Sequence, residues 1–482
     1  MAIQTLPLPI TKGVYRNADG EALSEFNFQL LDGYLNELGY HVKRPGVAPF
    51  ADLLIGEGFP VMGMYWWPNK QYVLAISNGK CFKIEYTAGG VTVTDLAGTL
   101  LTSGITTTFT TDGTYAFFAA GGPILYTDGI TGPTPIPDGD APTTVTHVDW
   151  IDGYLLAING TNKFFHSNLN DPTNWSALSY YSAVGNADNI VAMKVFEREI
   201  YLFGDVSLEV WENTGSIPSI FQRVQGSYKD VGCAAKYSPV FSEFGIFWLS
   251  NKRRFVKYSG GSIEPVSTPY DKEIEEMSSV SDCVGNLVKI NGITFMLFLF
   301  SSEDRTLAFN TANNTWSEWR HYNTTTGEYE RFLGNYHCHA EGWGMELVGS
   351  KDEAIVHAFS PTAYDDDGAP IRFSLQTGHV DHHSNSQKRC HELSMRVKRG
   401  TRELALTPVL MYRWRNDNKQ TWSNWHEKSL GDIGESSIPV IMRNLGIYTT
   451  RQWEFVVTEN VPFSFGSVLE SVESLNAKIV LS

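Results

Sequence analysis

The sequence predicts an all-β protein, a β-propeller of about six blades followed by a C-terminal antiparallel β-barrel or sandwich domain. Three observations support this fold class. Glycine provides 43 of the 482 residues, aromatic residues make up 13% and charged residues only 19%, a balance typical of turn-rich β structure. A hairpin pattern recurs through the middle of the chain. Beyond residue 360 it gives way to strands of alternating apolar and polar residues.

Residues 1–55 differ from the rest of the chain and predict an extended N-terminal arm. They begin with LPLPITKG after a short start, pass through an acidic polar stretch and end in NELGYHVKRPGVAPF. Pro7 and Pro9 interrupt the beginning, so we expect neither a signal peptide nor a membrane anchor there. The longest apolar run, Ile293–Phe300, is far shorter than the ~20 residues of a membrane-spanning helix.

Residues 56–360 are assigned to the propeller because one hairpin phrase recurs in them. Each copy has an apolar strand, a Gly- or Asn-bearing turn and a second strand rich in aromatic and β-branched residues. A blade buries its two faces only against neighbouring blades, so repeats of this length indicate a closed ring. A long β-sandwich or two stacked barrels is the alternative. The copies begin 39 to 49 residues apart, at Tyr72, Tyr115, Tyr154, Ile200, Gly245 and Thr294.

Residues 361–482 predict a separate C-terminal β domain. YDDDGAPI is an acidic turn that leads into an extended segment. The later segments ELSMRVKRG and RQWEFVVT alternate with a period of two, which is typical of half-buried antiparallel strands. Helix is expected to be scarce, and its best candidate is the acidic stretch Tyr270–Val280.

Charge and cysteine content limit the possible partners and the redox compartment. The chain has 37 Lys and Arg against 53 Asp and Glu, and its net charge of −16 opposes adhesion to nucleic acid or to an anionic membrane. The cysteines are odd in number, widely spaced and without a C-x-x-C pair, which predicts reduced thiols. They are Cys81, Cys233, Cys283, Cys338 and Cys390.

No motif in the sequence indicates catalysis. G-x-S-x-G, H-E-x-x-H and a phosphate-binding glycine loop are all absent. We therefore expect no enzyme, no catalytic residues, no metal or cofactor-binding residues and no cofactor. A cluster of histidines and cysteines has ligand types that zinc prefers, but its spacing is not that of a zinc finger, and ordinary packed or exposed side chains are the preferred interpretation. The cluster consists of His337, Cys338, His339, His379, His382, His383, Cys390 and His391.

Aromatic residues leave a carbohydrate-related function open as the alternative. RNDNKQTW (Arg415–Trp422) resembles the Asp box, S-x-D-x-G-x-T-W, of sialidase propellers, with Asp417, Thr421 and Trp422 at matching places. The resemblance predicts a hairpin turn rather than a catalytic site. Six tryptophans are expected to pack between blades, although they could form a platform for sugars. They are Trp66, Trp67, Trp150, Trp175, Trp211 and Trp248.

NELGYHVKRPGV (Asn36–Val47) resembles the N-terminal signature of the packaged-DNA stabilisation proteins, the tail nozzle or tail-hub subunits of short-tailed bacteriophages (podoviruses). Three further stretches are similar to that family in the same order: Ser182–Gly215, Gly232–Tyr258, and Tyr364–Phe373 with TWSNW. The motif residues that carry the resemblance, with expected roles in structure and assembly, are Tyr40, Lys43, Arg44, Pro45, Gly46, Glu209, Trp211, Gly215, Gly232, Cys233, Trp248, Tyr364, Asp366, Gly368 and Trp422.

The resemblance implies a structural protein of the virion tail, assembled in the host cytoplasm. It implies a homo-oligomer, a hexameric ring below the portal and the adaptor or head-to-tail connector, that extends the DNA channel. Such a ring retains packaged DNA and provides the exit path during genome ejection. The implied partners are the adaptor, a tail fibre or tailspike and a tail-tip needle or plug. Packaged DNA is expected to pass through the lumen without specific binding, past a wall rich in Asp and Glu.

Overall fold

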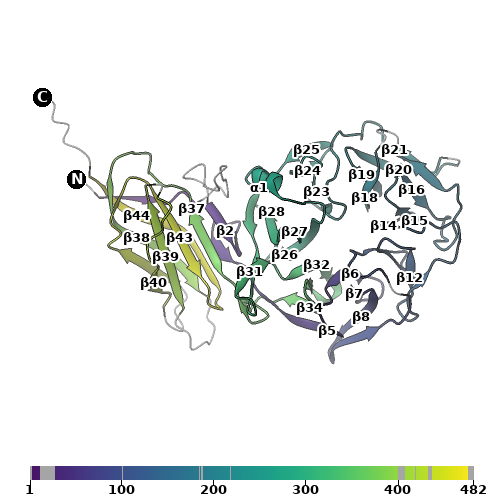
Figure 1. Ribbon diagram of the computed structural model, residues 1–482, viewed down its shortest axis with the longest axis horizontal. Helices are drawn as coiled ribbons and strands as arrows, with labels where there is room; N and C mark the ends of the chain where they lie inside the picture. Colours follow the sequence, from purple (N-terminus) through teal and green to yellow (C-terminus); the bar gives the residue numbers. More distant parts are fainter. Residues whose placement is uncertain are drawn as a thin grey trace.

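The computed structural model describes residues 3–10, 28–99, 101–183, 185, 188–217, 219–399, 408–417, 419–431 and 437–475. Figure 1 shows two β bodies side by side, a ring of small sheets and a flatter body of longer strands. The first and the last strands of the described chain, residues 4–7 and 463–474, both lie in the flatter body.

The ring is a β-propeller, and its first five blades are four-stranded antiparallel meanders. The first strand of each blade is the innermost, and innermost strands of neighbouring blades contact each other around the channel. The strands of these blades are, in order, β6 (Val61–Trp67), β7 (Tyr72–Ser77), β8 (Lys80–Thr87) and β9 (Gly90–Asp95); β10 (Thr108–Thr111), β11 (Ala116–Ala119), β12 (Leu125–Thr127) and β13 (Thr134–Pro135); β14 (His147–Ile151), β15 (Tyr154–Ile158), β16 (Lys163–His166) and β17 (Tyr180–Ser182); β18 (Ile190–Phe196), β19 (Glu199–Gly204), β20 (Leu208–Asn213) and β21 (Phe221–Arg223); β22 (Val240–Ser242), β23 (Gly245–Leu249), β24 (Phe255–Ser259) and β25 (Ser262–Pro265).

Two further blades complete the ring, and one of them is built from both ends of the propeller. Blade 6 contains four consecutive strands, whereas blade 7 combines three consecutive strands with β5, which pairs antiparallel with β34. A strand from the beginning of the propeller thus closes its last blade. Blade 6 consists of β26 (Val284–Ile290), β27 (Ile293–Phe300), β28 (Arg305–Asn310) and β29 (Thr315–Glu318), and blade 7 of β5 (Val47–Glu57), β32 (Gly334–Ala340), β33 (Met345–Ser350) and β34 (Glu353–Phe359).

The predicted propeller is confirmed, and within the described residues its blades number seven, one more than the six counted hairpins. The six hairpins correspond to blades 1 to 6. Blade 7 has a hairpin of the same kind, β33 and β34, whose sequence MELVGSKDEAIVHAF was not among the six counted copies. Only the fourth strand of this blade, β5, lies beyond the reach of a search for consecutive hairpins, because it is about 300 residues from β34 in the sequence.

Each pair of neighbouring blades encloses an apolar cluster, and β27 shows why. All eight of its residues are buried. Met296, Phe298 and Phe300 point into the cluster shared with blade 5. Phe295 and Leu297 point into the cluster shared with blade 7. The run ITFMLFLF is thus an alternating strand whose two faces are both covered, and burial of one such side chain contributes about 1.5–3 kcal/mol.

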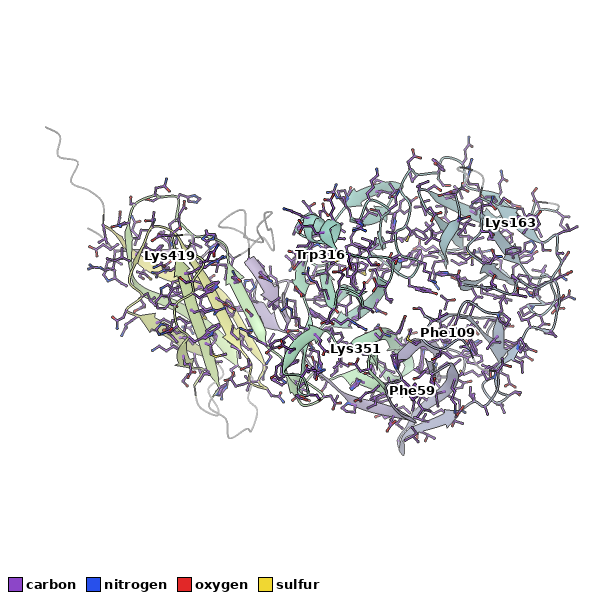
Figure 2. The ribbon with its side chains drawn as sticks, in the orientation of Figure 1. Phe59, Phe109, Lys163, Trp316, Lys351 and Lys419 are labelled. Carbon is purple, nitrogen blue, oxygen red and sulfur yellow. The ribbon has the colours of Figure 1, made fainter. Side chains whose placement is uncertain are left out.

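The tryptophans expected between blades are found there. Five of the six are buried in the clusters between neighbouring blades, and Trp150 is partly buried against one of them. Figure 2 shows Phe109 and Trp316, two further aromatic side chains, among those that fill the ring. The five cysteines are buried free thiols, in agreement with the expectation of reduced cysteines.

The C-terminal domain is a sandwich of two sheets around one core, which confirms the predicted barrel or sandwich. Side chains of both sheets, such as Leu393 and Phe465 from one and Leu375 and Phe455 from the other, share a single apolar cluster. One sheet contains β1 (Gln4–Pro7), β3 (Gly33–Leu35), β4 (His41–Lys43), β38 (Lys388–Arg399), β41 (Ser437–Arg443), β42 (Ile447–Tyr448) and β44 (Phe463–Ser474), and the other β2 (Phe28–Leu31), β37 (Phe373–Thr377), β39 (Val409–Asn416), β40 (His426–Ser429) and β43 (Arg451–Val457).

The second of these sheets is continuous with blade 6. Leu31 of β2 pairs in parallel with Glu318 of β29, so one sheet extends from the propeller into the sandwich. Strands β1 to β4 lie in the sandwich, and β5 lies in the propeller. The domain boundaries at residues 55 and 360 stay predictions. The remaining elements are β30 (Arg320–Asn323), β31 (Glu328–Arg331), β35 (Asp365–Asp366), β36 (Ala369–Pro370) and the 3₁₀ turn Glu341–Trp343.

The one α-helix of the described residues, α1 (Asp271–Glu276), lies within the stretch predicted to be helical. Its Ile274 is buried in the cluster between blades 5 and 6. No helix among the described residues has the length and apolar character needed to cross a membrane.

Closure of the ring by β5 predicts different effects for two adjacent leucines. Leu53 is 1% exposed, in the cluster between blades 7 and 1, whereas Leu54 is 79% exposed. We expect Leu53→Ala to lower the free energy of unfolding by about 3 kcal/mol, because it leaves a cavity between blades. The control, Leu54→Ala, should change it by less than ~0.5 kcal/mol. Chemical denaturation measures both, and equal effects would contradict closure by β5.

Candidate functional site

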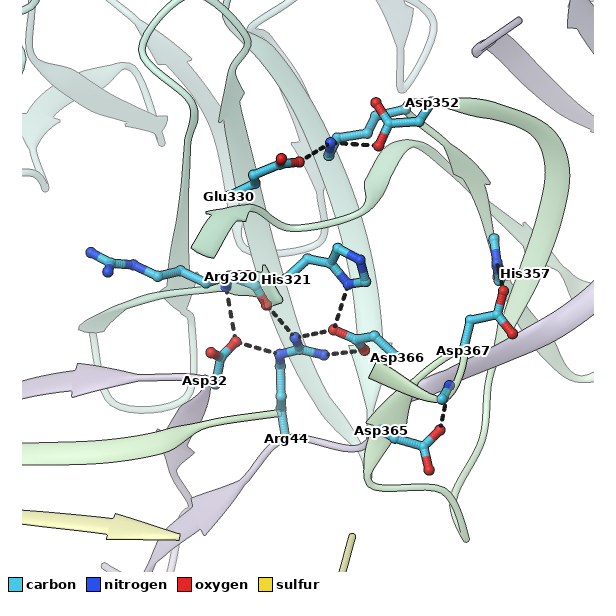
Figure 3. A network of polar contacts seen from close by, with 12 residues as sticks. Asp32, Arg44, Arg320, His321, Glu330, Asp352, His357, Asp365, Asp366 and Asp367 are labelled. Carbon is cyan, nitrogen blue, oxygen red and sulfur yellow. Dashed lines mark hydrogen bonds and ion pairs between the residues drawn. The ribbon is translucent and has the colours of Figure 1, made fainter. Parts of the chain in front are cut away.

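The candidate site is the joint between the propeller and the sandwich, where two predicted motifs meet (Figure 3). Arg44 of the KRPG phrase and Asp366 of the YDDDG phrase are 322 positions apart and hydrogen-bonded to each other. Arg44 directly follows β4 of the sandwich, and β5 of blade 7 begins at Val47. The site therefore lies where the chain crosses from one body to the other.

The Arg44 side chain is fully buried, and all three guanidinium nitrogens donate hydrogen bonds. Nη1 and Nη2 donate to the two carboxylate oxygens of Asp366 at 2.8 and 2.6 Å. Nε donates to Asp32 Oδ1 at 2.8 Å, and Nη2 also donates to the carbonyl oxygen of Arg320 at 2.7 Å. A lysine cannot reproduce this planar, bidentate arrangement.

Two aromatic rings enclose the guanidinium group. Its central carbon lies 4.9 Å from the centroid of the Phe332 ring and 5.6 Å from that of Trp319. Both rings belong to the cluster between blades 6 and 7. They shield the ion pairs from water, and in such an environment electrostatic attraction is stronger than at the surface.

Asp32 connects these ion pairs to the backbone of blade 6. Its N–H donates to the carbonyl oxygen of Glu318 at 2.9 Å, and its carbonyl oxygen accepts the N–H of Arg44 at 3.1 Å. Its carboxylate also accepts the N–H of Arg320 at 2.9 Å. The Glu318 carboxylate in turn binds Arg305 and Arg320, each at 2.9 Å. The joint is thus a network that includes strand backbone from both bodies.

Burial and the neighbouring charges shift the pKa values of Asp366, Arg44 and Asp32. Burial alone would raise the pKa of Asp366, but Arg44 and His321 bring it below its usual value. Burial alone would lower the pKa of Arg44, but the two aspartates raise it, so the guanidinium stays charged. For Asp32, burial has the largest effect and raises the pKa, against the opposing effects of Arg44 and the Arg320 N–H.

Gly46 occupies a position that tolerates no side chain. A Cβ at this residue would lie 1.8 Å from the carbonyl oxygen of Asp365. Its N–H donates to the carbonyl of Ala363 at 2.8 Å, and its own carbonyl accepts the N–H of Ser360 at 3.0 Å. The adjoining Pro45 carbonyl lies 3.4 Å from Arg44 Nη1. The two predicted phrases therefore pack backbone against backbone.

Lys43 is a buried cation next to the joint. Its side chain is fully buried, and Nζ donates to the carbonyl oxygen of Glu459 at 2.7 Å. Burial lowers the pKa of Lys43 to about 7, against the attraction of Asp32 and Glu459. Tyr40 lies nearby in the sandwich, where Lys398 Nζ is 4.7 Å from the centre of its ring.

The other residues of the second phrase shape the same joint. The N–H of Tyr364 donates to Asn460 Oδ1 at 2.9 Å, which links the turn to the sandwich. Gly368 has a φ of +82°, which favours glycine, and its N–H donates to Asp365 Oδ1 at 3.1 Å. Of the predicted motif residues, the structure thus brings Lys43, Arg44, Pro45, Gly46, Tyr364, Asp366 and Gly368 together.

The motif residues of blade 4 lie far from this joint in the chain and have local partners. Glu209 is buried, and its carboxylate accepts the indole N–H of Trp211 at 2.9 Å and the N–H of Gly185 at 2.6 Å. Trp211 belongs to the cluster between blades 3 and 4. Gly215 follows β20 with a φ of +66°. These contacts give the residues structural positions within the blade.

The motif residues between blades 4 and 5 are also packed. A Cβ on Gly232 would lie 2.1 Å from the carbonyl oxygen of Asp205. The buried Trp248 donates its indole N–H to the Gly232 carbonyl at 3.0 Å. Burial raises the pKa of Cys233 to about 11, so this thiol stays protonated at neutral pH.

The Asp-box-like segment braces a turn of the sandwich. The Asp417 carboxylate accepts the N–H groups of Thr449 and Thr450 at 2.7 and 3.1 Å. Trp422 lies over the outer face of the sheet, with the guanidinium carbons of Arg413 and Arg415 at 4.7 and 5.1 Å from its ring. The resemblance therefore marks a hairpin turn, as predicted.

The histidine and cysteine cluster is dispersed over two bodies. His337 and His339 both contact Glu346 in blade 7, at 2.5 and 2.7 Å. His382 and His391 contact two different glutamates of β44, at 2.9 and 3.0 Å. Within the described ranges, no group of three or more His, Cys, Asp or Glu side chains has the placement needed to hold a metal ion.

Sequence reasoning missed several residues of the joint, among them Asp32, Trp319 and Phe332. One signal for Asp32 exists: it is a single carboxylate inside the apolar stretch QLLDGYL, and a buried aspartate needs a partner. Trp319 and Phe332 carry no signal beyond their apolar character, because the guanidinium they enclose comes from a distant part of the chain.

Comparisons with known proteins find a family model that matches most of the chain. A family model described as bacteriophage P22 Gp10, β-propeller, matches residues 6–364. That range covers the propeller and most of the strands that precede β5, and it ends just before Asp366. No curated protein matches the chain.

Several solved structures are similar to the propeller. The WD40 β-propeller domain of Doa1 shares 13% identity at a TM-score of 0.42, over 66% of this chain and 97% of that chain. The N-terminal domain of Nup159 shares 11% identity at a TM-score of 0.41, over 72% of this chain and 98% of that chain. The computationally designed Ika8 protein shares 11% identity at a TM-score of 0.39, over 66% of this chain and 100% of that chain. At these TM-scores the likeness supports no functional conclusion.

The burial of Arg44 predicts a large effect of its removal. Arg44→Met leaves two buried carboxylates without a counter-ion, so the free energy of unfolding should fall by about 3–5 kcal/mol. Lys80→Met is the control, because the Lys80–Asp95 pair, at 2.9 Å, is exposed. Its loss should cost less than ~1 kcal/mol. Chemical denaturation compares them, and similar small losses would show that the joint stabilises little.

The low pKa of Lys43 predicts stability that increases at alkaline pH. The ordinary lysine pKa in the unfolded chain is ~10.4, so above pH 7 the folded state loses its proton first and the unfolded state holds more protons. Raising the pH therefore favours the folded state, by up to ~3 kcal/mol between pH 7 and 9.5. In Lys43→Met this rise should be absent, whereas Lys80→Met should retain it. Denaturation at several pH values tests this, and a flat wild-type profile contradicts it.

Proposed function

Because the chain belongs to the bacteriophage P22 Gp10 β-propeller family of phage-stabilisation proteins, we propose that it is a subunit of the tail nozzle of a short-tailed phage. It is a structural protein of the phage particle. In the proposed role, six copies form a ring below the portal and adaptor. The ring extends the DNA channel, retains the packaged genome and provides its exit path during ejection.

The observation that carries this proposal is the buried joint. The wall of a channel that holds DNA under pressure has to keep its parts in one fixed orientation. In this chain the pairing of Leu31 with Glu318 joins blade 6 and the sandwich in one sheet. Next to it, the Arg44 guanidinium group binds two carboxylates. Asp32 precedes Arg44 in the chain, and Asp366 follows it. Both features support a subunit that acts as one rigid body.

The cavity described in the propeller's own channel is small, which supports a DNA passage formed between subunits. A cavity of 170 Å³ lies in this channel, with Thr108, His147 and Tyr336 among its lining residues. At about 30 Å³ per water molecule it holds about six waters. The major groove of DNA alone is about 12 Å wide. We propose that several subunits around a common axis form the DNA path.

The net charge of the chain favours a passage that does not bind DNA. The −16 charge of the chain repels phosphates through the overall field. A wall that bound phosphates through lysine and arginine would hold the genome in place, because each such contact releases counter-ions and adds affinity. We propose that acidic residues face the lumen of the ring and that the DNA passes without specific binding.

The proposed partners are the adaptor or connector above the ring, a tail fibre or tailspike at its side and a needle or plug at the tip. We propose no catalytic activity. The carboxylates at the joint are held by Arg44, whereas hydrolysis of glycosides needs two carboxylates directed at a substrate. A tryptophan platform for sugars finds little support, because five of the six tryptophans are buried between blades.

Particles assembled without this chain test the proposal. Such particles should package DNA and then lose it to added nuclease, and purified wild-type chain should restore nuclease protection. Lys80→Met should restore it equally, whereas Leu53→Ala should restore less, because the ring of blades is destabilised. Electron cryomicroscopy of restored particles should show a six-membered ring below the adaptor. Retention of DNA without the chain, or density for the chain elsewhere, would overturn the proposal.

A further inference from the structure

The channel of the propeller contains a small pocket with unusual chemistry. It lies near the beginning of the innermost strands, and its volume is 170 Å³. Apolar side chains, among them Met193 and Phe241, form part of its lining. Its polar lining includes Lys194, Lys236 and Tyr237. The pocket thus combines an apolar part with two cations in a protein whose overall charge is strongly negative.

One of the two lysines is neutralised locally. Lys194 Nζ lies 3.1 Å from Asp149 Oδ2. The same oxygen accepts the N–H of Val195 at 2.8 Å, and Oδ1 accepts the N–H of Trp150 at 2.9 Å and the hydroxyl of Thr110 at 3.3 Å. The four donors occupy the Asp149 carboxylate fully. It therefore ties blades 2, 3 and 4 together and has no capacity left for a second lysine.

The second lysine has no carboxylate partner among the described residues. Lys236 Nζ lies 4.9 Å from the centre of the Tyr237 ring, a contact that positions the ammonium group without neutralising it. The pocket therefore carries one net positive charge from its lysines and Asp149. His147 adds none at neutral pH, because burial, helped by Lys236 and Lys194, lowers its pKa to about 4.

An unused hydroxyl donor lies in the same pocket. The Tyr237 hydroxyl is buried and has no hydrogen-bond partner within the part of the chain that the structure describes. Burial raises the pKa of Tyr237 to about 12, so the phenol keeps its proton and can donate it. The neighbouring Tyr336 hydroxyl is already engaged with Thr106. A buried donor without a partner is unfavourable unless something occupies the pocket.

We propose that this channel pocket binds a carboxylate on a short aliphatic stem. The carboxylate accepts hydrogen bonds from Lys236 Nζ and the Tyr237 hydroxyl, and the stem lies against Met193 and Phe241. Two sources share this chemistry: a free small carboxylic acid, and a glutamate side chain of a neighbouring protein in the tail. The site depends on the propeller alone and stands independently of the proposed nozzle function.

Titration of the purified full-length chain with glutarate tests the pocket. Isothermal titration calorimetry should give one site per chain that weakens as NaCl is raised. Lys236→Gln should weaken glutarate binding tenfold or more, and Tyr237→Phe about fivefold to tenfold, because each removes one hydrogen bond to a charged group. Lys252→Gln is the matched control, since Lys252 is an exposed lysine in blade 5. Its glutarate affinity should equal that of the wild type.

Thermal unfolding of each variant shows whether it is folded. A loss of glutarate binding is then not mistaken for a loss of folding. Glutaramide, which is uncharged, should not bind. If the wild-type chain does not bind glutarate, or if Lys236→Gln binds it as well as Lys252→Gln does, the proposal is overturned. Once glutarate binding is established, maps of assembled tails assign the source. Density continuous with another chain indicates a glutamate side chain, and isolated density indicates a free acid.

Discussion

A propeller blade has two apolar faces, and both are buried only when the ring of blades is closed. In this chain closure depends on β5, whose pairing with β34 completes blade 7. The residues just before β5 belong to the sandwich, so the chain has to cross between the bodies at Arg44, Pro45 and Gly46. Ring closure and docking of the sandwich are therefore achieved by one crossing, and the crossing has to be fixed in position.

The Arg44 ion pairs fix this crossing through specificity more than through net stability. Removing a guanidinium and two carboxylates from water costs free energy that their attraction offsets only when the geometry is nearly ideal. Here the two hydrogen bonds from the Arg44 guanidinium group to Asp366, and its hydrogen bond to Asp32, meet that condition. Another placement of the sandwich would leave these charges buried without partners. The joint thus excludes other placements of the sandwich against the propeller. The close backbone contact at Gly46 adds to this selectivity.

How much could be predicted from the sequence depends on where the interacting residues lie in it. Blades 1 to 6 are local meanders, and their hairpins are visible as consecutive strands. The addition of β5 to blade 7 and the joint both depend on residues about 300 positions apart, which no local pattern connects. Resemblance to the phage family identified Arg44, Gly46 and Asp366 as motif residues, but only the structure shows that they form one network. Asp32 belongs to that network and lies outside every recognised phrase.

Two passages with opposite electrostatic requirements result from this architecture. The channel of each propeller is narrow, and its pocket holds Lys236 without a carboxylate partner among the described residues, so it attracts a small anion. The lumen of the proposed ring has to be wide and has to repel the phosphates of DNA. A chain of net charge −16 can satisfy both, because a charge inside a narrow channel acts mainly on what enters it, whereas exposed charges set the field outside. A single cationic pocket within an acidic protein is therefore compatible with a DNA passage that does not bind its cargo.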